Sequence, residues 1–182
     1  MTKGHGEFFS QLATATLALT MVSMSFDVFL QKFSAGKSAR VNREAVLAVL
    51  RTTTSDRPDD FGFYVLEFPD GGHVEFSAQG LEGSGEFTGC AFHFHGGMSP
   101  DAVRFMFDIA KTGDMIILAA TEPFTPILSL PEQRKELPAE LADNTPTPVL
   151  CSSAAELESL LSGGYAGWQK YRDQVSHQNR RG

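Results

Sequence analysis

Apolar and polar residues alternate in three stretches of the chain, a pattern typical of β-strands with one buried face. The first is residues 25–33, and the other two are residues 61–68 and 73–79. The last two flank Asp70 and Gly71, a dipeptide typical of tight hairpin turns. The pattern therefore predicts three strands, of which the second and third form a hairpin.

The register of this hairpin decides which side chains are buried, because a slip of one residue exchanges the two faces of a strand. Pairing outward from a turn at Asp70 and Gly71 places Phe68 opposite His73 and Val65 opposite Phe76. This register predicts two sets of side chains on opposite faces: Phe63, Val65, Val74 and Phe76 in the core, and Tyr64, Leu66 and Phe68 on a second face. An exposed second face of this kind would favour a homodimer.

Two helices are marked by capping residues in front of apolar positions at helical spacing. The first follows Asn42 and the second follows Ser99, and both residue types cap helix N-termini. The second helix has Pro100 at its first position and Gly113 at its end, where these residues are favoured. Apolar residues surround it from 102 to 110, so we expect it to be buried against a sheet. The wholly apolar "MIILAAT" after it predicts a buried strand.

The segment from 122 to 148 differs from the rest, since six of the nine prolines fall there. We expect it to cover part of the domain, with one charged helical turn in "PEQRKEL". "TPVLCSS" predicts a last short strand. A capping box of Ser153 and Glu156 then begins a helix. Because Gly163 and Gly164 interrupt the apolar pattern, we expect the C-terminal region to form two helices.

The order of the elements is strand, helix, three strands, helix, one or two strands and C-terminal helices. Three consecutive strands without intervening helices disfavour a doubly wound fold. The fold class expected is therefore α+β, with a mostly antiparallel sheet, helices packed on one face as a two-layer sandwich, and C-terminal helices.

The chain of 182 residues is long enough for a single core, so we expect one α+β domain spanning residues 24–175. Residues 1–23 are expected to be an N-terminal extension. It is either translated from upstream of Met24, folded as an extra helix, or a signal peptide. Residues 176–182 are expected to be a flexible tail.

The composition disfavours several classes of partner. A formal net charge of −7 and a pI near 5.2 argue against nucleic acid, whose recognition requires clustered Lys and Arg. The apolar stretch 12–22 is shorter than the ~20 residues that span a membrane, so no membrane is expected. Cys90 and Cys151 lie far apart and fit buried, reduced thiols in the cytoplasm, with a single disulfide as the alternative.

The stretch "CAFHFHGG", residues 90–97, places His93 and His95 two residues apart. In a strand both side chains would point to one face. His73 and Glu75 repeat this spacing on a neighbouring predicted strand. Three imidazoles and a carboxylate suit divalent iron, manganese, zinc or copper, so these four residues are a candidate metal site. The alternative is that they line the solvated face of the sheet.

A second candidate site lies where this strand leads into the next helix. The amides of Gly96 and Gly97, with the helix start at Ser99, are arranged to cradle an anion or ligand, although Ser99 is also expected simply as a cap. Tyr165 and Trp168 are candidate surface aromatics for a ligand or partner. At helical spacing they fit the core equally well.

The stretches "MSFDVFLQKF", "FPDGGHVEF" and "GGYAGWQKYRDQV" resemble a group of small bacterial single-domain proteins without an assigned activity. The resemblance covers residues 24–175. It implies a cytosolic protein of one domain and transfers no catalytic residue to this chain.

Taken together, these features favour a small cytosolic protein-interaction module without catalytic activity, of the immunity type that neutralises a toxin. Because an acidic surface attracts basic partners, we expect an unknown, basic protein partner and no cofactor. The alternative is a metal- or small-ligand-binding protein, or an enzyme, that uses His73, Glu75, His93 and His95 with a divalent transition metal.

Overall fold

The computed structural model describes residues 25–121 and 123–179. Residues Ser25–Trp168 form one compact unit, and α5 continues beyond it from Gln169. The elements in chain order are β1 (Phe26–Gln31), β2 (Phe33–Ser34), β3 (Lys37–Ser38), α2 (Arg43–Leu50), β4 (Phe63–Glu67), β5 (His73–Ser77), β6 (Gly89–Phe94), α3 (Pro100–Gly113), β7 (Ile116–Ala119), β8 (Ile127–Leu128), the 3-10 helix η2 (Pro131–Lys135), α4 (Ala139–Asn144), β9 (Val149–Leu150) and α5 (Ala154–Asn179).

The expected extension, residues 1–23, lies outside the described residues. Of the expected tail, residues 176–179 are the last residues of α5, and residues 180–182 are also outside the described part.

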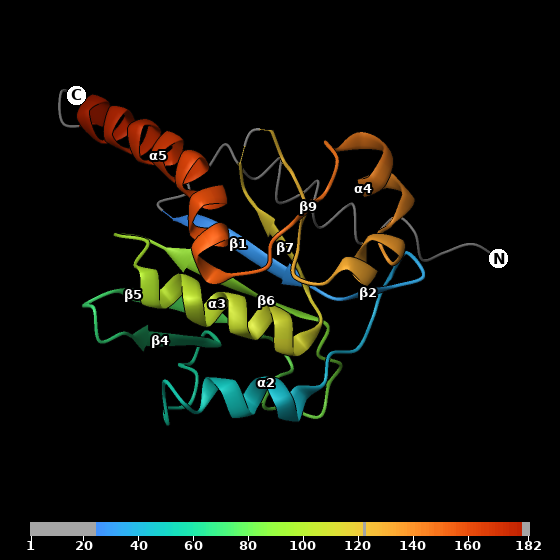
Figure 1. Ribbon diagram of the computed structural model, residues 1–182. Helices are drawn as coiled ribbons and strands as arrows, with labels where there is room; N and C mark the ends of the chain where they lie inside the picture. The colour runs from blue at the N-terminus through green and yellow to red at the C-terminus, as the bar shows by residue number, and fades with distance from the viewer. Residues whose placement is uncertain (1–24, 122, 180–182) are drawn as a thin grey trace. The chain divides into compact units, whose positions relative to one another are not determined.

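Seven strands form one sheet in the order β4-β5-β6-β1-β7-β8-β9 (Figure 1). All neighbours are antiparallel except β8 and β9, which are parallel. β2 and β3 form a separate two-stranded sheet. The α+β class with a mostly antiparallel sheet is therefore confirmed.

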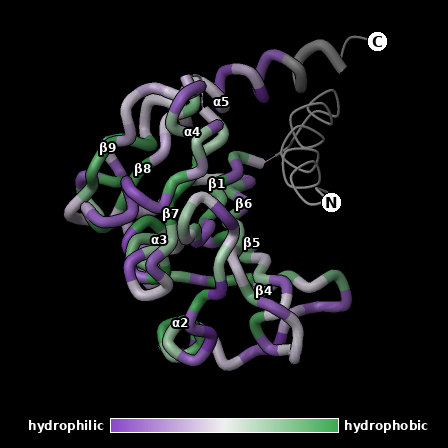
Figure 2. The backbone as a smooth tube through the Cα atoms, turned by 90° about the vertical axis from the view of Figure 1, so that its right-hand side faces the viewer, coloured by the Kyte–Doolittle hydropathy of each residue, from purple (hydrophilic) through white to green (hydrophobic). Residues whose placement is uncertain are grey.

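One face of the sheet carries the main core. Phe26, Val28 and Leu30 of β1 are buried, and they share this core with residues of α2, α3 and α5. Figure 2 shows α2 and α3 on the same side of the sheet. The expected two-layer arrangement is thus present. The opposite face carries Asp27 and His93 together with the buried Ile116 and Leu118 of β7.

The helix starts follow the expected capping chemistry. The Asn42 side chain accepts a hydrogen bond from the amide of Ala45 (3.2 Å), and the Ser99 side chain accepts one from the amide of Ala102 (3.2 Å). Each bond satisfies an amide that the first turn of a helix leaves without a partner. α3 is buried on most of its surface, as the sequence predicts.

The hairpin of β4 and β5 forms at the expected place, but the predicted register is wrong by one residue. Glu67 pairs with His73 and Val65 pairs with Glu75. The turn is longer than expected, because the amide of Phe68 donates to the carbonyl of Gly72 (2.8 Å). The slip exchanges the faces of β4.

Val65, predicted in the core, is therefore 57% exposed. Conversely, Tyr64, Leu66 and Phe68 are buried at 3%, 0% and 9% exposure. The apolar face on which the homodimer expectation rested consequently belongs to the core.

The C-terminal region is one continuous helix, α5, and the prediction of two helices is wrong. Gly163 and Gly164 lie inside it without interrupting it. A Cβ at Gly164 would lie 2.1 Å from Cγ2 of Thr121, so this glycine allows the helix to approach the end of β7 closely. Packing within the fold, and not a helix break, accounts for that glycine.

The start of α5 differs slightly from the predicted capping box. The Ser153 side chain accepts from the amide of Glu156 (3.2 Å), as expected. The Glu156 carboxylate reaches back one residue further than predicted and accepts from the amide of Ser152 (2.7 Å). This bond is the largest cause that lowers the pKa of Glu156.

The proline-rich segment forms β8, η2 and α4 and is attached to the β2–β3 turn and the start of β7. The amide of Gly36 donates to the carbonyl of Glu136 (3.1 Å), and the Gln133 side chain donates to Asp114 (3.1 Å). None of the helices that the structure describes has the length and apolar character required to cross a bilayer.

Candidate functional site

The candidate histidines lie on the face of the sheet opposite α2 and α3. β6 pairs with β5 on one side and with β1 on the other, so His93 stands between Glu75 and Asp27. We call the surface formed by Asp27, Glu75, Ser77 and His93 the polar face. The register thus places Glu75 directly beside His93.

His93 connects two strands through both of its ring nitrogens. Nδ1 lies 2.8 Å from Oδ1 of Asp27, and Nε2 lies 3.1 Å from Oγ of Ser77. Since a carboxylate only accepts hydrogen bonds, Nδ1 carries the proton and donates to Asp27. In the neutral ring Nε2 then accepts from the Ser77 hydroxyl. The result is a line of hydrogen bonds from Ser77 through His93 to Asp27.

This line is partly enclosed. The side chains of His93 and Asp27 are 19% and 24% exposed. The ring of Phe63 packs edge-on against His93, with 5.5 Å between the centroids. Asp27 also accepts a hydrogen bond from the Ser25 hydroxyl (2.7 Å). The imidazole is therefore held in one orientation by three neighbours.

A second interaction of the polar face joins β5 to the residues after β6. Nε2 of His95 lies 2.9 Å from Oε2 of Glu75. This pair is more exposed, at 41% and 43% of the two side chains. His73 is exposed, lies next to Gly96, and takes no part in either network.

The four predicted metal ligands are thus only partly brought together. In the portion of the chain that the structure describes, no three His, Cys, Asp or Glu side chains are grouped so that they could hold a metal ion. Both nitrogens of His93 already have hydrogen-bonding partners. Metal binding by His73, Glu75, His93 and His95 stays a prediction.

Asp27 and Ser77 are the residues of this site that the sequence analysis missed. Both lie at alternate positions of predicted strands, on the face opposite the apolar residues. Their proximity to His93 depends on the strand order β5-β6-β1, in which β1 inserts between β6 and β7. A Ser–His–Asp line of this polarity is the arrangement that activates a serine hydroxyl in nucleophilic catalysis.

The N-terminus of α3, the predicted anion site, receives a carboxylate from the chain itself. The amide of Asp101 donates to Oδ2 of Asp70 (3.0 Å), and the amide of Gly72 donates to Oδ1 (2.9 Å). These two bonds, the first being the larger effect, lower the pKa of Asp70. Because a bound anion at Gly96, Gly97 and Ser99 would compete with Asp70, that site stays a prediction without further support.

The predicted surface aromatics belong largely to the core. Tyr165 is 9% exposed and packs edge-on against Phe26, with 5.5 Å between the ring centroids. Its hydroxyl donates to the carbonyl of Gly96. Trp168 is partly buried against the same core. This arrangement corresponds to the core interpretation of these two residues.

Both cysteines are free and buried. Burial raises the pKa of Cys90 and is the main cause that raises the pKa of Cys151. Neither thiol has the low pKa that a nucleophilic cysteine requires.

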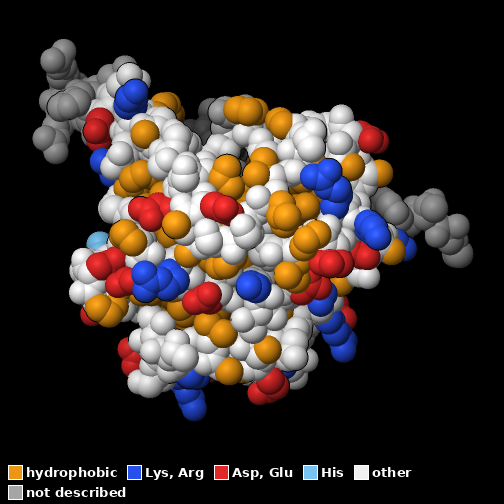
Figure 3. All heavy atoms as spheres, in the orientation of Figure 1, with side chains coloured by type: hydrophobic (Ala, Val, Ile, Leu, Met, Phe, Trp, Pro, Cys, Tyr) orange, Lys and Arg blue, Asp and Glu red, His pale blue; other side chains and the backbone are white. Residues whose placement is uncertain are grey.

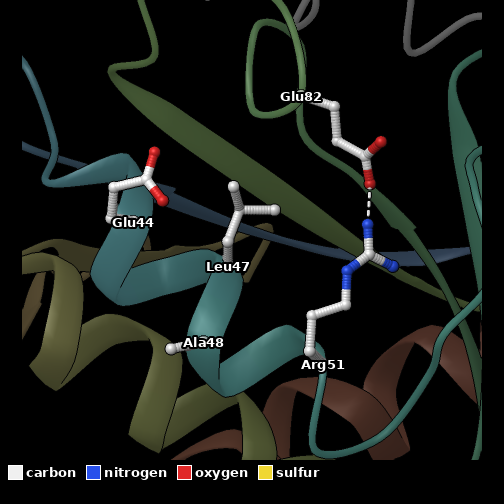
Figure 4. Close-up of a pocket in the computed structure, with 5 residues that line it drawn as sticks. All are labelled: Glu44, Leu47, Ala48, Arg51 and Glu82. Atoms are coloured by element: carbon white, nitrogen blue, oxygen red, sulfur yellow. Dashed lines mark hydrogen bonds and ion pairs between the residues drawn. The ribbon is translucent and has the colours of Figure 1, made fainter.

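A shallow pocket lies over α2, as Figure 4 shows. It is lined by Glu44, Leu47, Ala48, Arg51 and Glu82. Arg51 forms an ion pair with Glu82, whose carboxylate also accepts from the Tyr64 hydroxyl (2.8 Å). Burial, followed by this hydrogen bond, raises the pKa of Tyr64. Arg51 and Glu82 thus attach the loop after β5 to α2.

The surface charge is unevenly divided along the chain. Residues 25–168 contain twenty Asp and Glu against ten Lys and Arg, a formal charge of −10, whereas the whole chain carries −7. On the face drawn in Figure 3, acidic and basic side chains are interspersed without a patch of one sign.

Comparison with known proteins adds no relative: no protein-family model, characterised protein or solved structure matches this chain. The function is therefore inferred from the charge and the geometry described above.

Proposed function

We propose that this protein works by binding another protein that has a basic surface, and that it does so without catalysing a reaction. The observation that carries the proposal is the formal charge of −10 on the compact unit of residues 25–168. A field of this sign concentrates basic partners around the molecule and accelerates their encounter with it.

Two exposed apolar side chains lie close together in the sequence and supply a contact point for such a partner. Phe61 is 85% exposed and Val65 is 57% exposed. Large apolar side chains of this kind serve as anchors in protein interfaces, where charge selects the partner and apolar contact holds it.

The finer parts of the proposal follow from the same features. A toxin with a basic surface, neutralised by this protein, is the kind of partner that fits an acidic binding module. The two free, buried thiols are compatible with a reducing compartment, so we place the interaction in the cytoplasm.

The test is isolation of the untagged protein from the cells that make it, at about 0.05 M and about 0.5 M NaCl. We expect a single heterologous protein of high pI to accompany it in stoichiometric amount at low salt and to dissociate at high salt. Recovery of the protein alone or only with itself would contradict the proposal.

A second candidate function is favoured by the Ser77–His93–Asp27 line. In it Ser77 Oγ attacks an acyl carbonyl while His93 Nε2 takes the hydroxyl proton and later returns it to the leaving group. The distances of 3.1 Å and 2.8 Å lie within the range that such proton transfer requires.

A fluorophosphonate probe distinguishes the two candidates. Acyl-transfer activity would give covalent labelling at Ser77 that Ser77→Ala abolishes and that His93→Gln reduces by about 100-fold or more. Ser162→Ala, which changes an exposed serine of α5, is the matched control. Absence of labelling at Ser77 would remove this candidate and leave the binding function.

A further inference from the structure

β4 is the last strand at one end of the sheet. Among the described residues it pairs only with β5, so one of its two edges has no neighbouring strand. An edge of this kind presents a row of amide and carbonyl groups with which another strand can pair.

The register identifies which residues of β4 direct these groups outward. Phe68 and Gly72 are joined by a backbone hydrogen bond (2.8 Å), and bonded pairs alternate with non-bonded pairs in an antiparallel ladder. Val65 and Glu67 therefore belong to non-bonded pairs, and their amides and carbonyls point away from β5. We call the backbone of Val65 and Glu67 the β4 edge.

The start of the same edge is closed by the preceding loop. The amide of Asp59 donates to the carbonyl of Phe63 (2.8 Å), and the Asp59 carboxylate accepts from the amides of Phe61 and Phe63 (2.9 Å each). The first outward carbonyl of β4 is thus occupied within the chain. An incoming segment would pair with Val65 and Glu67, beyond the closed start.

The side chains around the β4 edge combine apolar contact with negative charge. Val65 is 57% exposed, and Glu67 next along this face is exposed too. Glu75 lies directly across from Val65 in β5. A strand added here would meet an apolar position flanked by two carboxylates, which favours an apolar residue opposite Val65 and Lys or Arg near Glu67.

The negative charge of the molecule decides which kind of partner strand is favoured at this edge: a second copy of this chain or a segment of a different protein. A second copy of this chain would bring two units of −10 together, with Glu67 and Glu75 of each copy near the contact. Like charges close together at an interface disfavour association. A basic segment of a different protein would instead be attracted by the opposite charge.

We propose that the β4 edge binds an extended, basic segment of the partner protein as an additional strand of the sheet. The proposal rests on the function proposed above and specifies where and how the partner is bound. Backbone hydrogen bonds to Val65 and Glu67 would provide the pairing. An apolar and a basic side chain two residues apart in the added strand, both on the face of Val65 and Glu67, would provide the selectivity.

The test measures binding of a short synthetic peptide with the repeat Val-Thr-Lys-Thr, called the Val–Lys peptide, by isothermal titration at low salt. In this repeat Val and Lys take successive positions on one face of the strand. Two variants change the edge: Val65→Pro removes an outward amide and is compatible with an edge strand, and Val65→Lys adds a charge without altering the backbone. We expect each to weaken peptide binding by about tenfold or more.

Leu160→Lys is the matched control, because it places the same charge on an exposed apolar residue of α5 (41% exposed). We expect it to change peptide affinity by no more than about twofold. A Val–Lys peptide N-methylated on every residue keeps the charge but has no backbone donor at either edge, and we expect it not to bind.

Several results would overturn the inference: no binding of the Val–Lys peptide, equal binding of its N-methylated form, equal weakening by Val65→Lys and Leu160→Lys, or self-association of the protein through β4. The isolation experiment described above distinguishes failure of this inference from failure of the proposed function. If the natural partner is recovered and Val65→Pro binds it normally, the β4 edge is not the binding site but the binding function remains.

Discussion

At the scale of single residues, Asp70 illustrates how the hairpin and α3 are joined. It lies in the turn between β4 and β5, yet its carboxylate accepts from the amide of Asp101 in the first turn of α3 (3.0 Å). The bond places a negative charge at the positive end of the helix dipole. One side chain therefore satisfies the turn and the helix start at once.

We expect Asp70→Asn to lower the urea midpoint of unfolding at about pH 7 and to have a smaller effect at about pH 2. The amide of Asp101, followed by that of Gly72, lowers the pKa of Asp70. A carboxylate whose pKa is lowered on folding stabilises the protein above its unfolded pKa of about 3.9, and this contribution disappears as the pH falls through the folded pKa.

Asp108→Asn is the control for this prediction, because Asp108 lies on the same helix and is exposed. We expect its urea midpoint to follow that of the wild type at both pH values. An Asp70→Asn midpoint that falls equally at both would show that the carboxylate charge is not what matters.

The residues of the polar face show which features of the site can be predicted from the sequence and which cannot. His93 and Glu75 could be assigned to one face because side chains of a strand alternate. The neighbours of His93 could not be identified in this way. Asp27 is distant in the sequence and lies beside His93 only because β1 lies between β6 and β7. Strand order is a long-range property that no local pattern specifies.

At the scale of elements, local signals predicted the starts of α2 and α3 well, but not the single C-terminal helix or the hairpin register. The caps at Asn42 and Ser99 are local, and both form as expected. The register of the hairpin depends on which pair of residues closes the turn. Gly71 has a φ of 82°, and it fits a turn closed by Phe68 and Gly72 as readily as a shorter one. In the observed register Tyr64 and Leu66 are packed in the core. The local sequence does not reveal this packing.

The two glycines inside α5 give an element-scale prediction. A Cβ at Gly163 meets nothing within 4 Å, so we expect Gly163→Ala to raise the free energy of unfolding by about 0.5–1 kcal/mol through helix propensity. A Cβ at Gly164 would lie 2.1 Å from Cγ2 of Thr121. We expect Gly164→Ala to lower the free energy of unfolding by about 1–3 kcal/mol.

Urea denaturation of the two variants compares these effects directly. Thr121→Ser removes Cγ2, and adding it to Gly164→Ala should recover much of the lost stability. If Gly163→Ala is the more destabilising of the two substitutions, helix α5 does not pack as described.

At the scale of the whole molecule, the acidic surplus affects stability as well as partner choice. The unit of residues 25–168 carries −10, and like charges destabilise a compact state by repulsion. Salt screens the repulsion between charges that lie further apart than the Debye length, which is about 10 Å at 0.1 M ionic strength. Folding stability should therefore depend on both salt and pH.

We expect the thermal midpoint at about pH 7 to rise when NaCl increases from about 0.02 to about 0.5 M. The rise should be smaller at about pH 5, near the pI of 5.2, where the net charge is small. A midpoint that falls with salt at about pH 7 would mean that attractive ion pairs outweigh the repulsion.

The central claim, that a basic partner segment pairs with the β4 edge, also concerns the whole molecule. Amide hydrogen exchange measured by NMR tests it most directly, because Val65 and Glu67 direct their amides outward while Tyr64 and Leu66 direct theirs toward β5. We expect fast exchange at Val65 and Glu67 in the free protein and at least about tenfold slower exchange with saturating Val–Lys peptide. Tyr64 and Leu66 should be protected in both states. Protection of Val65 and Glu67 in the free protein, or unchanged exchange at saturation, would contradict the account.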